Sequence, residues 1–155
     1  MDRIRILRAG VVEHNVMAEA MKEMQKQRIA DEIPDTLILV EHPEVVTVGP
    51  KAIREGVVVD GYPTVRTDRG GGITWHGPGQ LVAYPIVKWG LEEQNIRTII
   101  GRLEDWAIKA FADCGIRAYK DPSMQGTWVD GHKICSIGLS FLHWVSRHGM
   151  SINIQ

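Results

Sequence analysis

The chain has 155 residues, of which 44% are hydrophobic, enough for one domain with a buried core. Its 18 Lys and Arg residues and 19 Asp and Glu residues give a net charge of −1, so it lacks the positive field of a typical nucleic-acid-binding or membrane-surface protein. A local basic patch could still recruit an acidic partner. Two cysteines are too few for a disulfide framework, and no stretch reaches the ~20 apolar residues of a membrane span. We therefore expect a reducing, cytoplasmic setting, with no nucleic acid and no membrane as partner.

The hydrophobic pattern predicts a succession of short strands interrupted by two helices. In chain order, it predicts a strand at 4–7, a helix at 13–30, and strands at 36–40, 45–48, 63–67 and 81–87. Asn95 can cap a second, longer helix that ends before Gly115. Further strands are expected at 116–119, 126–129 and 134–141, and a last one opening at Met150. Because several strands follow one another directly, we expect an α+β domain with a mixed sheet backed by helices.

The segment from Asp68 to Gln80 is the most informative part of the sequence, because five of its 13 residues are glycine and it lies between two apolar strands. Glycine lets the backbone turn sharply and lets a ligand lie against bare peptide groups. The spacing matches neither a dinucleotide fingerprint nor a phosphate-binding P-loop, so nucleotide binding is not expected. A turn without chemistry is the alternative. Against it, Arg69, Thr74 and His76 bring polar groups to the open backbone, where binding residues usually lie.

This segment resembles the signature of the lipoyl (octanoyl) transferases, through Arg69-Gly70-Gly71, Thr74, Trp75 and His76-Gly77-Pro78-Gly79-Gln80. Three further matches lie in the family's order. One precedes the segment, at Val40–Pro43 with Thr47 and Gly49, and two come after it, at Gly131–Leu139 and at His148–Asn153. Together they extend over essentially the whole chain. The resemblance implies the biotin/lipoyl protein ligase-like fold, related to class II aminoacyl-tRNA synthetases, in one catalytic domain over residues 1–155.

The resemblance also implies an activity. Members of that family are octanoyltransferases, which move an octanoyl group from acyl carrier protein to a lysine of a lipoyl domain in lipoate biosynthesis. The implied acceptors are the lipoyl domains of 2-oxoacid dehydrogenases and the glycine cleavage H protein, and no cofactor or metal is implied. The family motifs assign substrate binding to Arg69, Gly70, Gly71, Gly72, Ile73, Thr74, Trp75, His76, Ser136, Ile137, Gly138, Gly149, Met150 and Ser151.

Lys133 matches the family lysine that lowers the pKa of the acyl-carrying cysteine. A free thiol has a pKa of ~8.5, and a nearby ammonium group stabilises the thiolate that attacks a thioester. The family cysteine lies in a Pro-Cys-Gly-like context beyond the last match, and the sequence reaches Gln155 before it, so we expect a domain that lacks its C-terminal segment. Cys135 lies two residues from Lys133, and on a regular strand both would face the same side. A packed role is nevertheless expected for Cys135, and a structural one for Cys114.

Two other functions stay open. The chain could be a non-catalytic protein that binds acyl groups or lipoyl domains after losing the nucleophile, or a ligase that activates lipoate or biotin with ATP. No glycine-rich adenylate loop of the biotin-ligase kind is evident, which disfavours the ligase. The leading interpretation requires that Arg69–His76 and the Lys133 ammonium group converge on one apolar cavity sized for an acyl chain.

Overall fold

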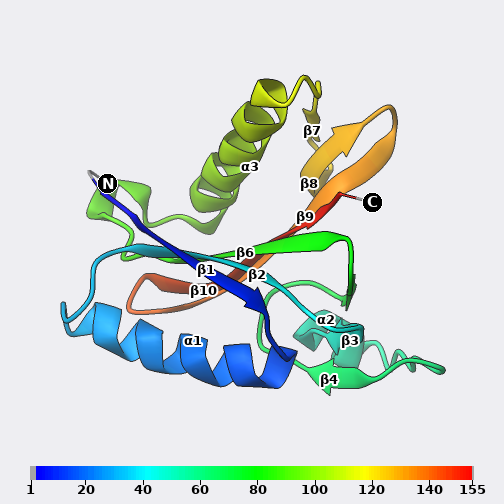
Figure 1. The fold of residues 1–155 in the computed structure, drawn as a ribbon, viewed down its shortest axis with the longest axis horizontal. Coiled ribbons are helices and arrows are strands. Elements are labelled where there is room, and N and C mark those ends of the chain that lie inside the picture. Colours follow the sequence, from blue (N-terminus) through cyan, green and yellow to red (C-terminus); the bar gives the residue numbers. More distant parts are fainter. Residues whose placement is uncertain (1–2, 155) are drawn as a thin grey trace.

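The computed structural model describes residues 3–154 of the chain, which form ten strands, three α-helices and one short 3-10 helix (Figure 1). In chain order the elements are β1 (Arg5–Val11), α1 (His14–Ile29), β2 (Thr36–Glu41), β3 (Val45–Val48), α2 (Pro50–Arg54), β4 (Thr64–Arg66), β5 (Ile73–His76), β6 (Gln80–Ile86), η1 (Leu91–Glu93), α3 (Ile96–Asp113), β7 (Tyr119–Asp121), β8 (Met124–Val129), β9 (His132–Leu142) and β10 (Val145–Asn153).

Seven of the strands form one large mixed sheet in the order β1-β2-β6-β10-β9-β8-β7. Strands β1 and β2 pair in parallel, and the other neighbouring strands of this sheet are antiparallel. Helix α1 covers one face through β6 and β10, and α3 covers the opposite face through β8 and β9 (Figure 1). The expected fold class, a mixed sheet backed by helices, is confirmed.

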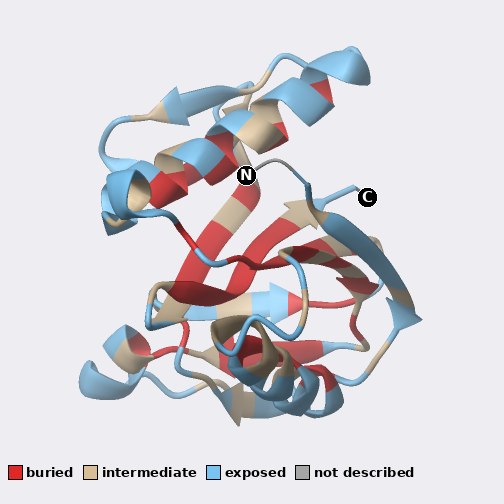
Figure 2. Cartoon of the chain, turned by 90° about the vertical axis from the view of Figure 1, so that its left-hand side faces the viewer, coloured by how far each residue is buried: buried red, intermediate tan, exposed pale blue. Residues whose placement is uncertain are grey.

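The large sheet is buried on both faces because its central strands alternate apolar side chains between two cores. On β6, Val82, Tyr84 and Ile86 belong to the core under α1, whereas Ala83 belongs to the core under α3. This is the period of two expected of a strand. Buried residues accordingly concentrate on the central strands (Figure 2). On the α1 side, the helix contributes the buried side chains of Met17 and Met21.

A smaller three-stranded sheet, in the order β4-β3-β5, lies with α2 beyond one end of the large sheet (Figure 1). The glycine-rich residues Gly70–Gly72, called the glycine segment below, join the two sheets. The Gly70 amide donates to the carbonyl oxygen of Leu139 on β9 at 2.8 Å, and the Gly49 amide donates to the carbonyl oxygen of Gly72 at 2.8 Å. The glycine segment is therefore held from both sides.

The helix boundaries follow from local chemistry. The Asn95 side chain accepts a hydrogen bond from the Thr98 amide at 3.2 Å, which confirms the predicted N-cap of α3. Beyond α3, Gly115 takes a positive φ of 78°, which a glycine adopts without strain. Among the helices described, none combines the length and the apolar character that crossing a bilayer requires.

The largest difference from the sequence-based prediction concerns β10, which begins at Val145 rather than at Met150. Strands β9 and β10 form a hairpin whose turn residues His143 and Trp144 both have positive φ, 47° and 59°. Such a turn usually contains Asn or Gly, so the sequence gives no turn signal there. Strand β7 also lies later than expected, at Tyr119–Asp121 rather than at 116–119, and neither α2 nor β5 is predicted from the pattern.

Candidate active site

A cavity of about 540 Å³ lies where the glycine segment meets β9, β10 and α3. It is called the main cavity below, and every site residue inferred from the sequence lines it except Trp75. The lining residues are His14, Lys51, Arg69, Gly70, Gly71, Gly72, Ile73, Thr74, His76, Val82, Tyr84, Ile96, Ile100, Met124, Gln125, Lys133, Ser136, Ile137, Gly138, Leu139, Phe141, His148, Gly149, Met150 and Ser151.

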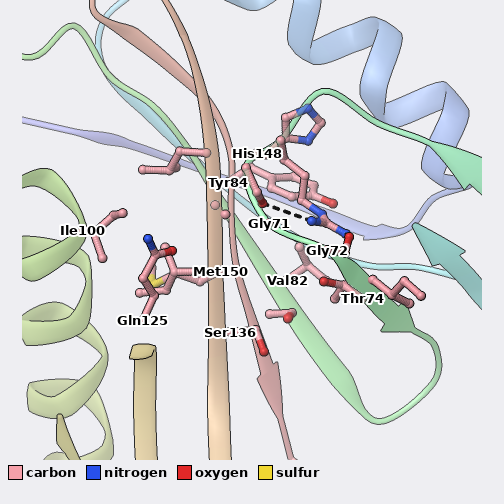
Figure 3. Close-up of a pocket in the computed structure, with 18 of the residues that line it drawn as sticks. Gly71, Gly72, Thr74, Val82, Tyr84, Ile100, Gln125, Ser136, His148 and Met150 are labelled. Carbon is pink, nitrogen blue, oxygen red and sulfur yellow. Dashed lines mark hydrogen bonds between the residues drawn. The ribbon is translucent and has the colours of Figure 1, made fainter. Parts of the chain in front are cut away.

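The two sides of the main cavity differ in chemistry. Ile100 and Met150 lie on the side of α3, whereas Tyr84 and His148 lie on the side of the glycine segment (Figure 3). One side therefore offers apolar contacts to a ligand, and the other offers polar groups and bare backbone.

Arg69 holds the glycine segment in place. Its guanidinium group is buried and donates to the carbonyl oxygens of Thr47, Gly70 and Gly72, each at 3.1 Å, and to the Thr47 hydroxyl at 2.6 Å. Among residues 3–154, no carboxylate lies within ion-pair distance of Arg69, and burial lowers its pKa from the ordinary value. The side chain lines the main cavity, but its donors are directed to the chain itself.

Glycines opposite the segment allow it to pack backbone to backbone. A Cβ atom at Gly138 on β9 would lie 2.5 Å from the Gly70 carbonyl oxygen, and one at Gly49 would overlap the Gly71 carbonyl oxygen. Any side chain at either position would push the segment away from β3 and β9. The lack of room for a side chain thus explains why glycine is present at these two positions of the family motifs.

Lys133 lines the same cavity from the beginning of β9. Its ammonium nitrogen lies 5.7 Å from the centre of the Trp128 ring, and its side chain crosses over Gly126, where a Cβ atom would lie 2.6 Å from the Lys133 Cε. The Gly126 amide donates to the buried carboxylate of Glu104 at 3.0 Å. The structure therefore brings Lys133 and the glycine segment to one cavity, as the sequence motifs predict.

Cys135 does not share the position of Lys133. Thr127 pairs with Cys135 but its neighbour Trp128 pairs with Lys133, so Ile134 is an extra residue in β9 and interrupts the regular alternation of side chains. Lys133 lines the main cavity, and Cys135 is fully buried in the core under α3. Burial raises the pKa of its thiol to about 12, despite the nearby Lys133. The strand is therefore not regular between Lys133 and Cys135, and the packed role predicted for Cys135 agrees with its burial.

Trp75 lies outside the main cavity, contrary to its assignment from the motif. Its indole nitrogen donates to the Glu44 carboxylate at 3.2 Å, and its ring fills the space over Gly77. On β5 the neighbouring His76 is buried and lines the cavity, whereas Trp75 is 38% exposed. The alternation of a strand separates the two side chains.

The sequence motifs gave no indication of a cluster of three buried histidines beside the cavity. The ring centres of His14, His42 and His76 lie 5.1 to 5.8 Å apart. His42 donates from Nδ1 to the Val12 carbonyl oxygen at 2.7 Å and accepts at Nε2 from the Tyr84 hydroxyl at 2.8 Å. Both ring nitrogens of His42 are therefore used within the protein, and His14 is a new member of the cavity wall.

Burial lowers the pKa of each of these three histidines. Burial lowers the pKa of His14 to about 3 and that of His76 to about 4, and the neighbouring histidines and Arg69 act in the same direction. His148 donates to the Asp68 carboxylate at 2.9 Å, and burial still holds its pKa below the ordinary value. Hydrogen bonds from His148 and Arg147 hold the pKa of Asp68 well below its usual range.

Comparison with known proteins first defines the fold. A bi-partite lipoate protein ligase from Thermoplasma acidophilum, solved in a study with its E2 lipoyl domain, matches with a TM-score of 0.66 and 15% identity, over 97% of this chain and 60% of that one. Lipoate-protein ligase A bound with ATP matches with a TM-score of 0.60 and 13% identity, over 98% of this chain and 66% of that one. The architecture is therefore that of the lipoate protein ligases.

The sequence then defines the family. Residues 15–155 match the model of the lipoyl protein ligase A/B catalytic domain, and the chain belongs to this family. The octanoyltransferase of Syntrophobacter fumaroxidans is 36% identical over 96% of this chain and 68% of its own length. That of Geobacter metallireducens is 36% identical over 94% of this chain and 68% of its own length. The resemblance to the octanoyltransferases is confirmed.

Proposed function

We propose that the main cavity binds the octanoyl chain of a thioester donor and that the protein acts as an octanoyltransferase in lipoate biosynthesis. The observation that carries this proposal is the convergence of Lys133 and the glycine segment on one cavity with an apolar side. Its volume of about 540 Å³ suits a small ligand. Each CH₂ group buried against residues such as Ile100 and Met150 contributes about 0.8 kcal/mol to binding.

In this proposal, Lys133 prepares the nucleophile for the first transfer. A cysteine thiolate attacks the carbonyl carbon of the octanoyl thioester, a new thioester forms, and the departing carrier thiolate takes up a proton. The Lys133 ammonium group favours the attacking thiolate by lowering the pKa of its thiol. The backbone of Ser136–Gly138 contacts the acyl carbonyl region, and Gly149–Ser151 closes the cavity over the chain.

The second transfer delivers the octanoyl group to the acceptor. The neutral amine of a lipoyl-domain lysine attacks the new thioester, an amide forms, and the cysteine leaves as a thiolate that receives the proton from the amine. The donor is octanoyl-acyl carrier protein, and the acceptors are the lipoyl domains of 2-oxoacid dehydrogenases and the glycine cleavage H protein. The names of the octanoyltransferase relatives support octanoyl transfer, and the study of a related ligase with its E2 lipoyl domain supports a lipoyl domain as the acceptor.

A direct transfer assay tests this function. The product of the natural coding region, with any codons beyond Gln155, is mixed with octanoyl-acyl carrier protein and an unmodified lipoyl domain, and intact masses are followed. We expect one octanoyl group on the lipoyl domain, and a rate at least about tenfold lower with Lys133→Ala. Lys109→Ala, an exposed lysine of α3, is the matched control and keeps the full rate. Absence of transfer, or an unchanged rate with Lys133→Ala, contradicts the proposal.

One observation favours a second function for the 155 residues alone. Cys135 is buried with a raised pKa and Cys114 is exposed at the end of α3, so neither thiol among residues 3–154 lines the main cavity. In this second function, the 155 residues bind octanoyl groups or lipoyl domains without forming a covalent adduct. Intact-mass analysis after mixing with the donor tests this function, and an octanoyl group found on Cys135 contradicts it.

A further inference from the structure

A second cavity, of about 530 Å³, adjoins the main one on the α1 side of the large sheet. It is called the basic cavity below. Helix α1, helix α2, the residues around the end of β4 and strand β10 enclose it, and Figure 1 shows the N-terminal end of α1 beside α2 and β4. Its lining residues are His14, Asn15, Ala18, Lys22, Pro50, Ile53, Arg54, Arg66, Thr67, Asp68, Arg147 and His148.

Positive charge predominates in the basic cavity. Lys22, Arg54, Arg66 and Arg147 line it, and Asp68 is the only carboxylate among the lining residues. Both oxygens of Asp68 are already engaged, one by Arg147 and the other by His148. Within residues 3–154, neither Arg54 nor Arg66 forms an ion pair. The cavity therefore has cationic groups that no carboxylate of the described chain neutralises.

The first turn of α1 adds a second feature that favours an anion. Residue Glu13, at the N-cap, makes no side-chain cap hydrogen bond, so the amides of the first turn are not capped by a side chain. The N-terminus of a helix carries a partial positive charge. Beside this helix end, His14 lines the cavity and is only 6% exposed. Its Nδ1 atom is buried and has no hydrogen-bond partner among the described residues. This atom has less than 1 Å² of accessible surface, so an anion in the cavity would meet the cations and the first-turn amides rather than His14 Nδ1.

The basic cavity adjoins the main one across a shared wall, because His14 and His148 line both. An extended molecule that passes over this wall can place an acyl thioester in the main cavity and an anionic group in the basic cavity. Acyl thioesters on carrier proteins have this form, since a phosphate ester joins their flexible thiol arm to the carrier.

We propose that the basic cavity binds the phosphate ester of the donor's carrier arm and so orients the octanoyl thioester in the main cavity. This inference rests on the proposed function, because it concerns the donor of that reaction. Guanidinium groups bind phosphate oxygens through paired hydrogen bonds, which suits Arg54 and Arg66. Free phosphate shares this chemistry, and the experiment separates it from the ester.

The test compares two donors that differ only in the phosphate. Binding of octanoyl-phosphopantetheine and octanoyl-pantetheine to the protein is measured by isothermal titration calorimetry. We expect the phosphorylated donor to bind at least about tenfold more tightly, because one or two charge-assisted hydrogen bonds to the phosphate contribute at least that much to the affinity. The double variant Arg54→Ala/Arg66→Ala should bind both donors equally, with the affinity for octanoyl-pantetheine unchanged. The preference should also weaken as salt concentration rises.

Two further measurements complete the test. The control Arg97→Ala/Lys109→Ala removes two exposed cations of α3, on the opposite face of the sheet, and should keep the preference. If inorganic phosphate reduces the binding of octanoyl-phosphopantetheine but not that of octanoyl-pantetheine, it competes for the same site. If inorganic phosphate itself binds as tightly as the ester, the site is assigned to free phosphate instead. Equal binding of the two donors by the unmodified protein overturns the inference but leaves the proposed function intact. If neither donor binds, the proposed function itself fails.

Discussion

At the scale of single residues, Gly126 determines whether Lys133 can reach the main cavity. Its φ of 111° lies in a region that disfavours other residues, and a Cβ atom would overlap the Cys135 carbonyl oxygen and lie 2.6 Å from the Lys133 Cε. Gly126→Ala should therefore lower the free energy of unfolding by about 3 kcal/mol, from backbone strain and overpacking together. It should also reduce octanoyl transfer, because the Lys133 side chain must move. Urea unfolding and the transfer assay measure the two effects.

Gly131→Ala is the matched control for Gly126. Its φ of 79° is also positive, but a Cβ atom there meets nothing within 4 Å. The substitution should cost only the backbone strain, about 1 kcal/mol, and leave transfer unchanged. An equal loss of stability for Gly126 and Gly131 would show that the close contacts of a Cβ at Gly126, with the Cys135 carbonyl oxygen and the Lys133 side chain, have no energetic effect.

The residues that the sequence predicted and those that it missed differ in how their position is encoded. Lys133 and Gly138 belong to a contiguous motif on one strand, so recognising the motif placed them together. His14 begins a helix and Lys51 lies on the short α2, and both reach the main cavity only through the packing of elements distant in sequence. No local pattern marks such residues. Trp75 illustrates the converse, because a residue inside a motif can face away from the site.

At the scale of elements, the glycine segment depends on Arg69 for its path between β3 and β9. Arg69→Lys keeps the charge but removes the planar group that reaches Thr47, Gly70 and Gly72 together. The buried Thr47 carbonyl oxygen and two partly buried ones then lose their donor, and we expect the free energy of unfolding to fall by about 2–4 kcal/mol. The affinity for octanoyl-pantetheine should also fall. Arg97→Lys, at an exposed position of α3, should change neither quantity measurably, and similar results for the two variants would contradict the role of Arg69.

The elements that the sequence missed have weak local signals. Strand β5 has four residues inside a glycine-rich stretch, and its pairing with β3 is a tertiary contact rather than a property of its own sequence. The start of β10 follows a turn at His143 and Trp144, residues that seldom adopt positive φ. By contrast, α1 and α3 have apolar residues at helical spacing, and β2 and β6 contain continuous apolar runs. These four elements were predicted close to their observed bounds.

At the scale of the whole molecule, the buried histidines couple stability to pH. Burial holds the pKa of His14 at about 3 and that of His76 at about 4, whereas unfolding returns both to about 6.5. The unfolded chain therefore binds more protons than the folded one below about pH 6.5, and stability must fall as pH falls through this range. The free energy of unfolding should decrease by about 2 kcal/mol for each of the two histidines between about pH 7.5 and about pH 5.

Replacing one histidine separates this effect from ordinary acid denaturation. Because the His14 Nδ1 atom has no partner among the described residues, His14→Leu removes the titrating group without removing a hydrogen bond of that atom. The free energy of unfolding of this variant is measured with urea at several pH values. Its decrease between about pH 7.5 and about pH 5 should be smaller than that of the unmodified protein by about 2 kcal/mol. His143→Asn, at an exposed turn position with a φ of 47° that Asn tolerates, should keep the full loss. If His14→Leu keeps the full pH-dependent loss as well, the folded protein accommodates a protonated His14, and the lowered pKa of His14 is wrong.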